Sequence, residues 1–235
     1  MRVVQMMEGY SVMRIPKEQT YEWLLKKHYA KRIPQISHSF ALYLYDNLVG
    51  ICTYGQPPST NLRYCCGESY QDNVLELNRV IKNDFLGRNV QSFFIAQTFK
   101  LLSKPIVVVS YADSNYGHHG YVYQALNFFY TGLGGETKEY IIKGKRYSSR
   151  HIKDYWFKNN KQPFDPNKTI DENFKSIGEL VINVKQKHRY IIFLGSKKQL
   201  KDMKSKFTYP ILPYPKGDNQ RYDASYEPKV QGLLI

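Results

Sequence analysis

The chain has 235 residues, of which 42% are hydrophobic and 23% charged, a composition typical of a globular protein with a full core. It has no apolar run near the roughly 20 residues of a membrane span and no signal-peptide stretch at its start, so we expect no membrane partner. Three cysteines, Cys52, Cys65 and Cys66, are too few for a disulfide framework and favour a reducing, cytoplasmic compartment.

Basic side chains are concentrated toward the C-terminus. The chain holds 34 Lys and Arg against 20 Asp and Glu. Residues 1–137 carry 13 basic and 10 acidic side chains, whereas residues 138–235 carry 21 and 10, a net charge of +11. This asymmetry points to a polyanionic partner, duplex DNA first, with a basic surface that serves solubility as the alternative. The sequence indicates no protein partner.

The N-terminal part of the chain predicts a helix and a β-hairpin. Pro16 suits the first turn of a helix, where its missing N–H costs nothing, and apolar side chains then recur at helical spacing. Asp46 and Asn47 separate two strand-like runs by the two residues of a tight hairpin turn. The expected elements are a helix over about 17–29, strands over 40–45 and 48–54, a polar loop over 56–73 and a strand over Val74–Lys82.

The rest of the chain alternates strands and helices. Residues 105–112 form a continuous β-branched run, which is typical of a central strand buried on both faces. Ser196 and Gln199 have the spacing of a capping box at the start of a helix. The expected elements are a turn over 84–89, helices over 91–103 and 122–128, strands over 129–131, 139–148 (turning at Lys143–Gly144) and 189–194, and a helix over 196–207, with 150–177 basic and irregular.

This order of elements predicts an α/β fold with a mixed central sheet flanked by helices. It matches the acyltransferase fold called GNAT, in which the active cleft opens where two neighbouring central strands splay apart. Here those strands are Val74–Lys82 and residues 105–112. We expect a GNAT-like catalytic domain over 1–150 and a basic C-terminal extension over 151–235 that packs on it and contacts DNA.

Polar residues interrupt the strand over Val74–Lys82. Alternation places Glu76 and Asn78 on one face, and Leu77 and Arg79 on the other. Polar groups in a central strand are costly unless they are paired or used. Arg79 could bind a carboxylate or phosphate through two parallel hydrogen bonds. The alternative is a buried Glu–Arg pair.

The segment GRNVQS, from Gly87 to Ser92, lies between a strand and a helix. If Asn89 is the N-cap, Ser92 falls in the first turn, where backbone N–H groups bind anions. The GNAT fold normally holds the pyrophosphate of coenzyme A there, with a Gly-x-Gly or Gly-x-Ala pattern. Asn89 stands at the second position, so coenzyme A is disfavoured, although it remains an alternative. Plain helix capping is the other alternative.

The segment SYADSNYGHHGYVYQ is the densest polar cluster. Asp113 ends the central strand, at the edge where sites on α/β sheets gather, and Tyr123 follows on a helix. An Asx turn is the alternative for Asp113, and a solvated loop for His119, while the role of His118 stays open.

His28 and Tyr29 end the first predicted helix, which lies over the cleft in a GNAT-like fold. They could therefore converge with Asp113 and Tyr123. Imidazole, carboxylate and phenolate groups together suit iron better than magnesium or calcium. The alternative for His28 is an ordinary core histidine.

A set of motifs together resembles one family. HYAKR, CTYGQPPS, ELNRV, the N-x-x-S of Asn89 and Ser92, and SYAD followed by GHHGYVYQALNFFYTG recur in this order in the phage Mom DNA-modification family. The resemblance runs from about residue 20 to 150, and HRYIIFLGSKK and YPILPYPKG resemble the C-terminal part of Mom-like proteins. The basic segment over about 150–180 has no counterpart.

The resemblance implies a GNAT-like enzyme that converts adenine in duplex DNA to N6-carbamoylmethyladenine and so blocks host restriction enzymes. It implies Arg79 and Ser92 in the cleft, and His28, Tyr29, Asp113 and Tyr123 as an iron-binding set. We expect Arg79, Ser92, Asp113 and Tyr123 to be catalytic, and Gly87 and Asn89 to contact a cofactor. The alternatives are a coenzyme A-dependent N-acyltransferase on a small amine or protein, and a non-catalytic DNA-binding protein.

Overall fold

The structure is a computed structural model. It describes residues 7–57, 59–114, 117–142, 145–148, 152, 156–175, 181–218 and 226. The chain divides into two compact units, of which the first comprises Met1–Gly132 and His188–Ile235 and the second Leu133–Lys187. Among the described residues, no helix has the length and apolar character needed to cross a membrane. The three cysteines are buried and free.

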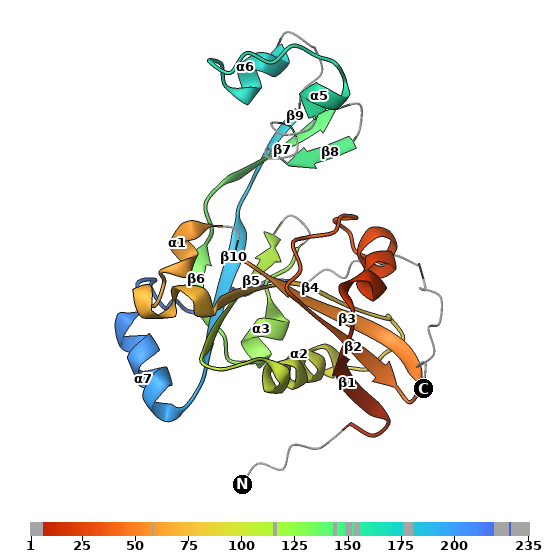
Figure 1. The fold of residues 1–235 in the computed structure, drawn as a ribbon, viewed down its shortest axis with the longest axis vertical. Coiled ribbons are helices and arrows are strands. Elements are labelled where there is room, and N and C mark those ends of the chain that lie inside the picture. Colours follow the sequence, from red (N-terminus) through yellow and green to blue (C-terminus); the bar gives the residue numbers. More distant parts are fainter. Residues whose placement is uncertain are drawn as a thin grey trace. The chain divides into compact units, whose positions relative to one another are not determined.

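The first unit is built on a seven-stranded mixed sheet with the order β1-β2-β3-β4-β5-β10-β6 (Figure 1). Strands β1 to β4 pair antiparallel, whereas β4 and β5 run parallel. This sheet and the β2–β3 hairpin confirm the α/β class and the hairpin that the sequence predicts. The hairpin turn is one residue earlier than predicted, at Tyr45 and Asp46, because Asn47 already pairs with Leu44. The strands are β1 (Tyr10–Arg14), β2 (His38–Leu44), β3 (Asn47–Gly55), β4 (Val74–Lys82), β5 (Ile106–Asp113), β6 (Phe129–Leu133) and β10 (Lys187–Leu194).

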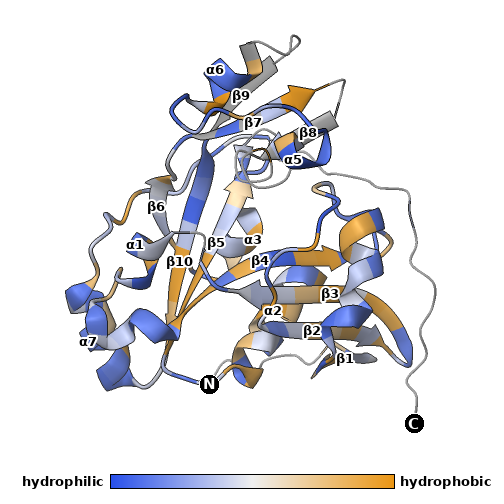
Figure 2. Cartoon of the chain, turned by 45° about the horizontal axis from the view of Figure 1, so that its top comes forward, coloured by the Kyte–Doolittle hydropathy of each residue, from blue (hydrophilic) through white to orange (hydrophobic). Residues whose placement is uncertain are grey.

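Helices cover both faces of this sheet, because alternate residues of β5 belong to different cores. Val108 packs in one core with Phe94 of α2 (Val90–Leu101). Val107 packs in the other with Leu62 of α1 (Thr60–Arg63) and Met203 of α7 (Lys197–Lys206). Helix α3 (Tyr121–Ala125) joins the α2 side, and η3 (Glu68–Asn73) joins the α1 side. The outer helix α7 is mostly hydrophilic, whereas β2 and β3 are largely hydrophobic (Figure 2).

The helix predicted over 17–29 is present as a continuous helical stretch, but it ends at Lys27 and changes its type along its length. The chain forms a short 3-10 helix, η1 (Lys17–Thr20), and then a π-helix, η2 (Trp23–Lys27). The His28 N–H donates to the Trp23 carbonyl at 3.0 Å, and His28 itself has extended backbone angles, φ −75° and ψ 135°. The wider π turn therefore ends the helix at Lys27, and His28 and Tyr29 lie in the loop that follows.

The second unit has a sheet and a core of its own. Its strands pair antiparallel in the order β8-β7-β9. Tyr140, Trp156 and Phe174 lie in its core. The turn predicted at Lys143–Gly144 lies outside the described residues. The elements are β7 (Thr137–Ile142), β8 (Lys145–Ser148), α5 (Phe157–Asn159), α6 (Ile170–Lys175) and β9 (Val181–Lys185).

The second unit is an insertion between two strands of the first. The expected boundary lies at residue 150, but the division in the structure runs at 132/133 and at 187/188. Strand β10 returns to the main sheet and lies between β5 and β6. The Gly134 N–H donates to the Lys187 carbonyl at 2.8 Å, so the two ends of the insertion meet.

Candidate active site

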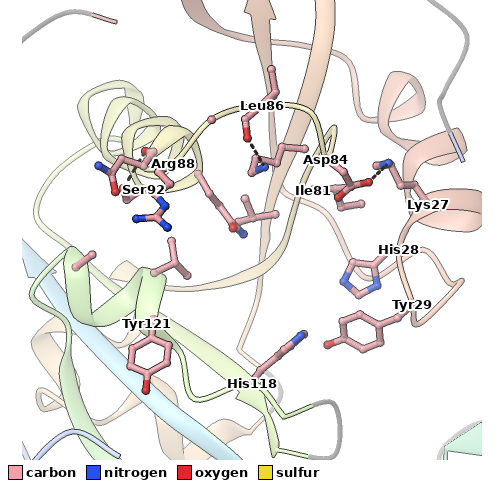
Figure 3. A pocket seen from close by; sticks show the side chains of 17 residues that line it. Lys27, His28, Tyr29, Ile81, Asp84, Leu86, Arg88, Ser92, His118 and Tyr121 are labelled. Atoms are coloured by element: carbon pink, nitrogen blue, oxygen red, sulfur yellow. Dashed lines mark hydrogen bonds and ion pairs between the residues drawn. The ribbon is translucent and has the colours of Figure 1, made fainter. Parts of the chain in front are cut away.

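The candidate site is a cleft at the carboxyl ends of β4 and β5. Their parallel pairing runs from Val74 opposite Val107 to Leu77 opposite Ser110 and then stops, although both strands continue. The splayed central strands that the sequence predicts are therefore present. Two adjoining cavities open there, of about 560 and 170 Å³, and both are lined by His28, Tyr29, His118 and Tyr121. Figure 3 shows these four side chains around the larger cavity.

A β-bulge decides which side chains of β4 share a face. Thr53 of β3 pairs with Arg79 and Tyr54 pairs with Leu77, so Asn78 is an extra residue on β4. The bulge shifts the alternation by one, which places Glu76 and Arg79 on the same face. The face predicted for Glu76 relative to Arg79 is therefore wrong.

Asn78 itself has a structural role. Its amide donates to the Gln35 carbonyl at 2.9 Å, and its oxygen accepts from the Thr53 hydroxyl at 2.6 Å. These bonds hold the bulge against the neighbouring strand and loop.

Arg79 lines the smaller cavity with one donor unused. Its Nη1 donates to the Asn78 carbonyl at 2.5 Å, but its buried Nε has no hydrogen-bond partner among the described residues. Burial lowers the pKa of Arg79, and Arg32 adds to this effect, while Tyr29, Glu76 and Tyr123 act in the opposite direction. A buried guanidinium with an unused N–H is suited to bind an acceptor oxygen of a ligand.

Tyr123 lines the same cavity from α3. Burial raises the pKa of Tyr123 to about 12, although a hydrogen bond with Ser110 and the charge of Arg79 lower it. Ser110 is fully buried, and its hydroxyl donates to the Leu77 carbonyl at 2.8 Å, at the last pair before the strands separate. Tyr123 is thus a neutral phenol at physiological pH. Because Ser110 gives its only proton to the Leu77 carbonyl, the Tyr123 hydroxyl donates to Ser110 and presents acceptor lone pairs to the cavity.

His28, Tyr29 and His118 form an aromatic wall that lines both cavities. The rings of His28 and Tyr29 are 4.2 Å apart, and those of Tyr29 and His118 are 6.0 Å apart and edge-on. The Ala30 N–H donates to His28 Nδ1 at 3.0 Å, which fixes the ring. The structure therefore brings His28 and Tyr29 to the cleft, and adds His118, whose role the sequence left open.

Asp113 is a buried neighbour of His118. It is 5% exposed, and its carbonyl accepts from the His118 N–H at 3.2 Å. Burial lowers the pKa of His118, while the charge of Asp113 raises it. His118 is therefore a largely neutral imidazole near pH 7, with a buried carboxylate beside it.

The expected iron site receives no support from the structure. In the part of the chain that the structure describes, no three His, Cys, Asp or Glu side chains gather in a group that could hold a metal ion. His28, Tyr29 and Tyr123 line the smaller cavity, whereas Asp113 lines neither cavity. The geometry does not support an iron site, and we derive no step of the reaction through a metal.

The segment from Gly87 to Ser92 lines the larger cavity. Asn89 is the N-cap of α2, as expected, but it has a left-handed φ of 67° and its side chain makes no capping hydrogen bond. The Ser92 hydroxyl donates to the Asn89 carbonyl at 2.9 Å. Ser92 therefore offers acceptor lone pairs rather than a free donor. A Cβ on Gly87 would meet no atom within 4 Å, so its backbone borders open space.

Three cations that sequence reasoning missed line the larger cavity: Lys27, Lys82 and Arg88. Lys27 is 5% exposed, and its Nζ lies 2.9 Å from Asp84 Oδ2 and 2.9 Å from the Tyr226 carbonyl. Lys82 donates to the carbonyls of Asn83 and Leu86, each at 3.2 Å. No spacing in the sequence marks these cations, because they come from the π-helix, the end of β4 and the loop before α2.

The chain is similar in sequence to one protein family and to a phage protein. The family model described as the Mom protein family matches residues 9–216. Methylcarbamoylase mom of Escherichia phage Mu is 28% identical over 229 residues, which cover 88% of this chain and 86% of that protein.

Two solved acetyltransferases also resemble the chain. One is an N-acetyltransferase of Staphylococcus aureus Mu50, with 12% identity and a TM-score of 0.42 over 80% of this chain and 100% of that one. The other is a GNAT family acetyltransferase of Elizabethkingia anophelis with acetyl-CoA bound, with 9% identity and a TM-score of 0.40 over the same shares. Likeness of this degree says nothing about ligand or activity.

Proposed function

This chain belongs to the Mom protein family, and from that membership we propose that it is a transferase that modifies DNA. The finer proposal is that it converts adenine in duplex DNA to N6-carbamoylmethyladenine. In a bacterial host cell this product protects phage DNA from restriction. The observation that carries the proposal is the family match over residues 9–216, which includes every residue that lines the cleft.

The reaction joins the adenine N6 to the carbon of an incoming group. An activated carbamoylmethyl donor, R–CH2–CO–NH2, loses R together with the bonding electrons, and the amine loses one proton. The amine is a weak nucleophile because its lone pair is delocalised into the ring. It is also buried in the duplex, so the base must be flipped out, at a cost of a few kcal/mol. The cleft must therefore position both reactants and accept one proton.

Residues of the smaller cavity are suited to these tasks. The unused Nε–H of Arg79 is a donor for the carboxamide oxygen of the incoming group, and the phenol oxygen of Tyr123 is an acceptor for its carboxamide N–H. His118, neutral near pH 7, can accept the proton of the amine, with Asp113 beside it. Ser92, Gly87 and Asn89 border the larger cavity.

Duplex DNA is the proposed macromolecular partner. The excess of 34 basic over 20 acidic side chains supports it, because phosphate neutralisation dominates binding to nucleic acid. The rival proposal, a coenzyme A-dependent N-acyltransferase, would form an amide bond to a carbonyl carbon. The two proposals therefore differ in their product on adenine.

Resistance to restriction tests the proposal. Plasmid DNA from bacteria that express the protein should resist restriction enzymes whose recognition sites contain adenine. The same DNA should still be cut by enzymes whose sites contain only guanine and cytosine, which is the internal control. Equal cutting by both classes of enzyme would contradict the proposal.

A further inference from the structure

We infer that the larger cavity binds the flipped-out purine nucleotide of the DNA substrate, with its phosphate on the cations and its base against the aromatic wall. This inference rests on the proposed function, which supplies DNA as the substrate. It also divides the cleft, because the smaller cavity beside Arg79 is then left for the transferred group.

The two cavities differ in volume. The larger one has a volume of about 560 Å³, which lies within the range of roughly 300–1,000 Å³ typical of pockets for nucleotide- or drug-sized ligands. The smaller one has about 170 Å³, room for a group of a few atoms such as a carboxamide. The transferred carbamoylmethyl group is therefore small enough for the smaller cavity, whereas a nucleotide needs the larger one.

The cations that line the larger cavity also favour the nucleotide there. The larger cavity is lined by Lys27, Lys82 and Arg88 against one carboxylate, Asp84. Asp84 and the Tyr226 carbonyl accept from Lys27, which holds this buried ammonium in place. Arg88 is exposed at the start of α2, and its guanidinium lies across the cavity from the His28 and Tyr29 rings (Figure 3). Cations fixed before binding lose little entropy when they receive a phosphate.

The aromatic wall supplies the surface for the base. His28 and Tyr29 lie 4.2 Å apart, and Tyr121 lines the cavity from α3. Bases removed from a duplex are commonly held by stacking on such rings. Because His28, Tyr29 and His118 line both cavities, a base on this wall lies where the two cavities meet. Its exocyclic amine can then face Arg79 and Tyr123.

Equilibrium titration of the full-length protein with dAMP tests the inference. We expect dAMP to bind more tightly than deoxyadenosine, because only dAMP carries the phosphate. Arg88→Gln should weaken dAMP binding about tenfold or more and leave deoxyadenosine binding unchanged. Lys100→Gln, which removes one charge from an exposed position at the other end of α2, is the matched control and should leave both affinities unchanged.

Three results would overturn the inference. They are equal affinity for dAMP and deoxyadenosine, dAMP binding that Arg88→Gln leaves intact, and coenzyme A that binds more tightly than dAMP and displaces it. The assay needs no turnover. If expressed protein leaves DNA unmodified but Arg88-dependent dAMP binding persists, the proposed function fails and the nucleotide site stands. If DNA is modified but Arg88→Gln changes neither dAMP binding nor modification, the nucleotide site fails alone.

Discussion

Arg79 occupies a position that costs stability unless a ligand completes it. A buried donor without a partner costs about 1–3 kcal/mol, and the Nε of Arg79 is such a donor. We expect Arg79→Lys to abolish DNA modification, because an ammonium cannot present the planar pair of donors. The thermal unfolding midpoint and the affinity for DNA should stay close to those of the wild type.

Two outcomes would contradict this role for Arg79. Retained modification in Arg79→Lys would show that the planar donors are not needed. A lowered unfolding midpoint, with loss of modification in proportion, would mean that the arginine pairs with Glu76 to hold the fold.

The histidines give a pH dependence of stability with a definite sign. Burial lowers the pKa of His38, His118 and His188 below the ordinary value of 6.5. As the pH falls, these histidines therefore take up protons at a higher pH in the unfolded chain than in the folded chain. Acidification consequently favours unfolding. We expect the free energy of unfolding, measured by urea titration, to be highest above about pH 7 and to fall between roughly pH 6.5 and 5. His118→Gln should flatten this slope. An unchanged slope would mean that His118 titrates as it does in water.

Much of the site can be predicted from residue types, and the exceptions have physical causes. Arg79 and Tyr123 can be predicted as site residues from their positions. Arg79 is a charged residue in a central strand, which is costly unless it is paired or used, and Tyr123 follows the end of the next central strand. That Glu76 and Arg79 share a face cannot be predicted, because the bulge at Asn78 adds one residue and the alternation of the sequence does not reveal it. The cations of the larger cavity come from separate elements and share no spacing.

At the scale of elements, the N-terminal helix shows where periodicity misleads. Tyr21, Leu24 and Leu25 fit a helical face, but Leu25 is 45% exposed and the chain forms a π turn instead. In this wider turn Trp23 and Leu24 are both buried, in one core with residues of β2 and β3. Helix propensities do not predict a π-helix. The β-branched run of β5 and the capping box of α7 are local features of the sequence, and both predicted elements form.

The glycine before α3 should be essential for the position of that helix. Gly120 has a φ of 75°, and a Cβ there would lie 2.4 Å from the Tyr190 ring. We expect Gly120→Ala to lower the free energy of unfolding by about 2 kcal/mol or more, from left-handed strain and the clash together. Chemical denaturation measures the change.

Gly87→Ala is the matched control on the other side of the cleft. Its Cβ would meet no atom within 4 Å, and its φ is not positive, so the stability should stay within about 0.5 kcal/mol of the wild type. A loss of modification in Gly87→Ala without a loss of stability would indicate close approach of a ligand. A Gly120→Ala variant as stable as the wild type would mean that α3 can shift freely.

At the scale of the whole molecule, the insertion should be removable. Its ends meet at the hydrogen bond between Gly134 and Lys187, and Arg189 hydrogen-bonds Thr131 just outside it. We expect a chain in which a two-residue turn replaces residues 134–186 to fold cooperatively, with circular dichroism like that of the wild type after the lost residues are allowed for. An unfolded product would show that the first unit depends on the insertion.

The sequence does not predict the boundaries of the insertion at 132/133 and 187/188, because β10 pairs with strands that are far away in the chain.

DNA binding should depend strongly on salt. If about six phosphates are neutralised, the affinity should fall roughly a thousandfold between about 50 and 200 mM salt. Residues 134–186 carry 11 basic and 7 acidic side chains, a net charge of +4, so the shortened chain should show a shallower salt slope if the insertion contacts DNA. Affinity that does not change with salt would remove the electrostatic argument for a DNA partner.

Mass spectrometry of nucleosides detects the proposed product itself. DNA from cells that express the wild-type protein, Arg79→Lys or the control Lys100→Gln is digested to nucleosides and analysed. We expect the wild type and the control to yield a deoxyadenosine heavier by one carbamoylmethyl group in place of hydrogen, and Arg79→Lys to yield none. Unmodified deoxyadenosine from wild-type cells, or an acetylated deoxyadenosine in place of the carbamoylmethyl form, would contradict the account.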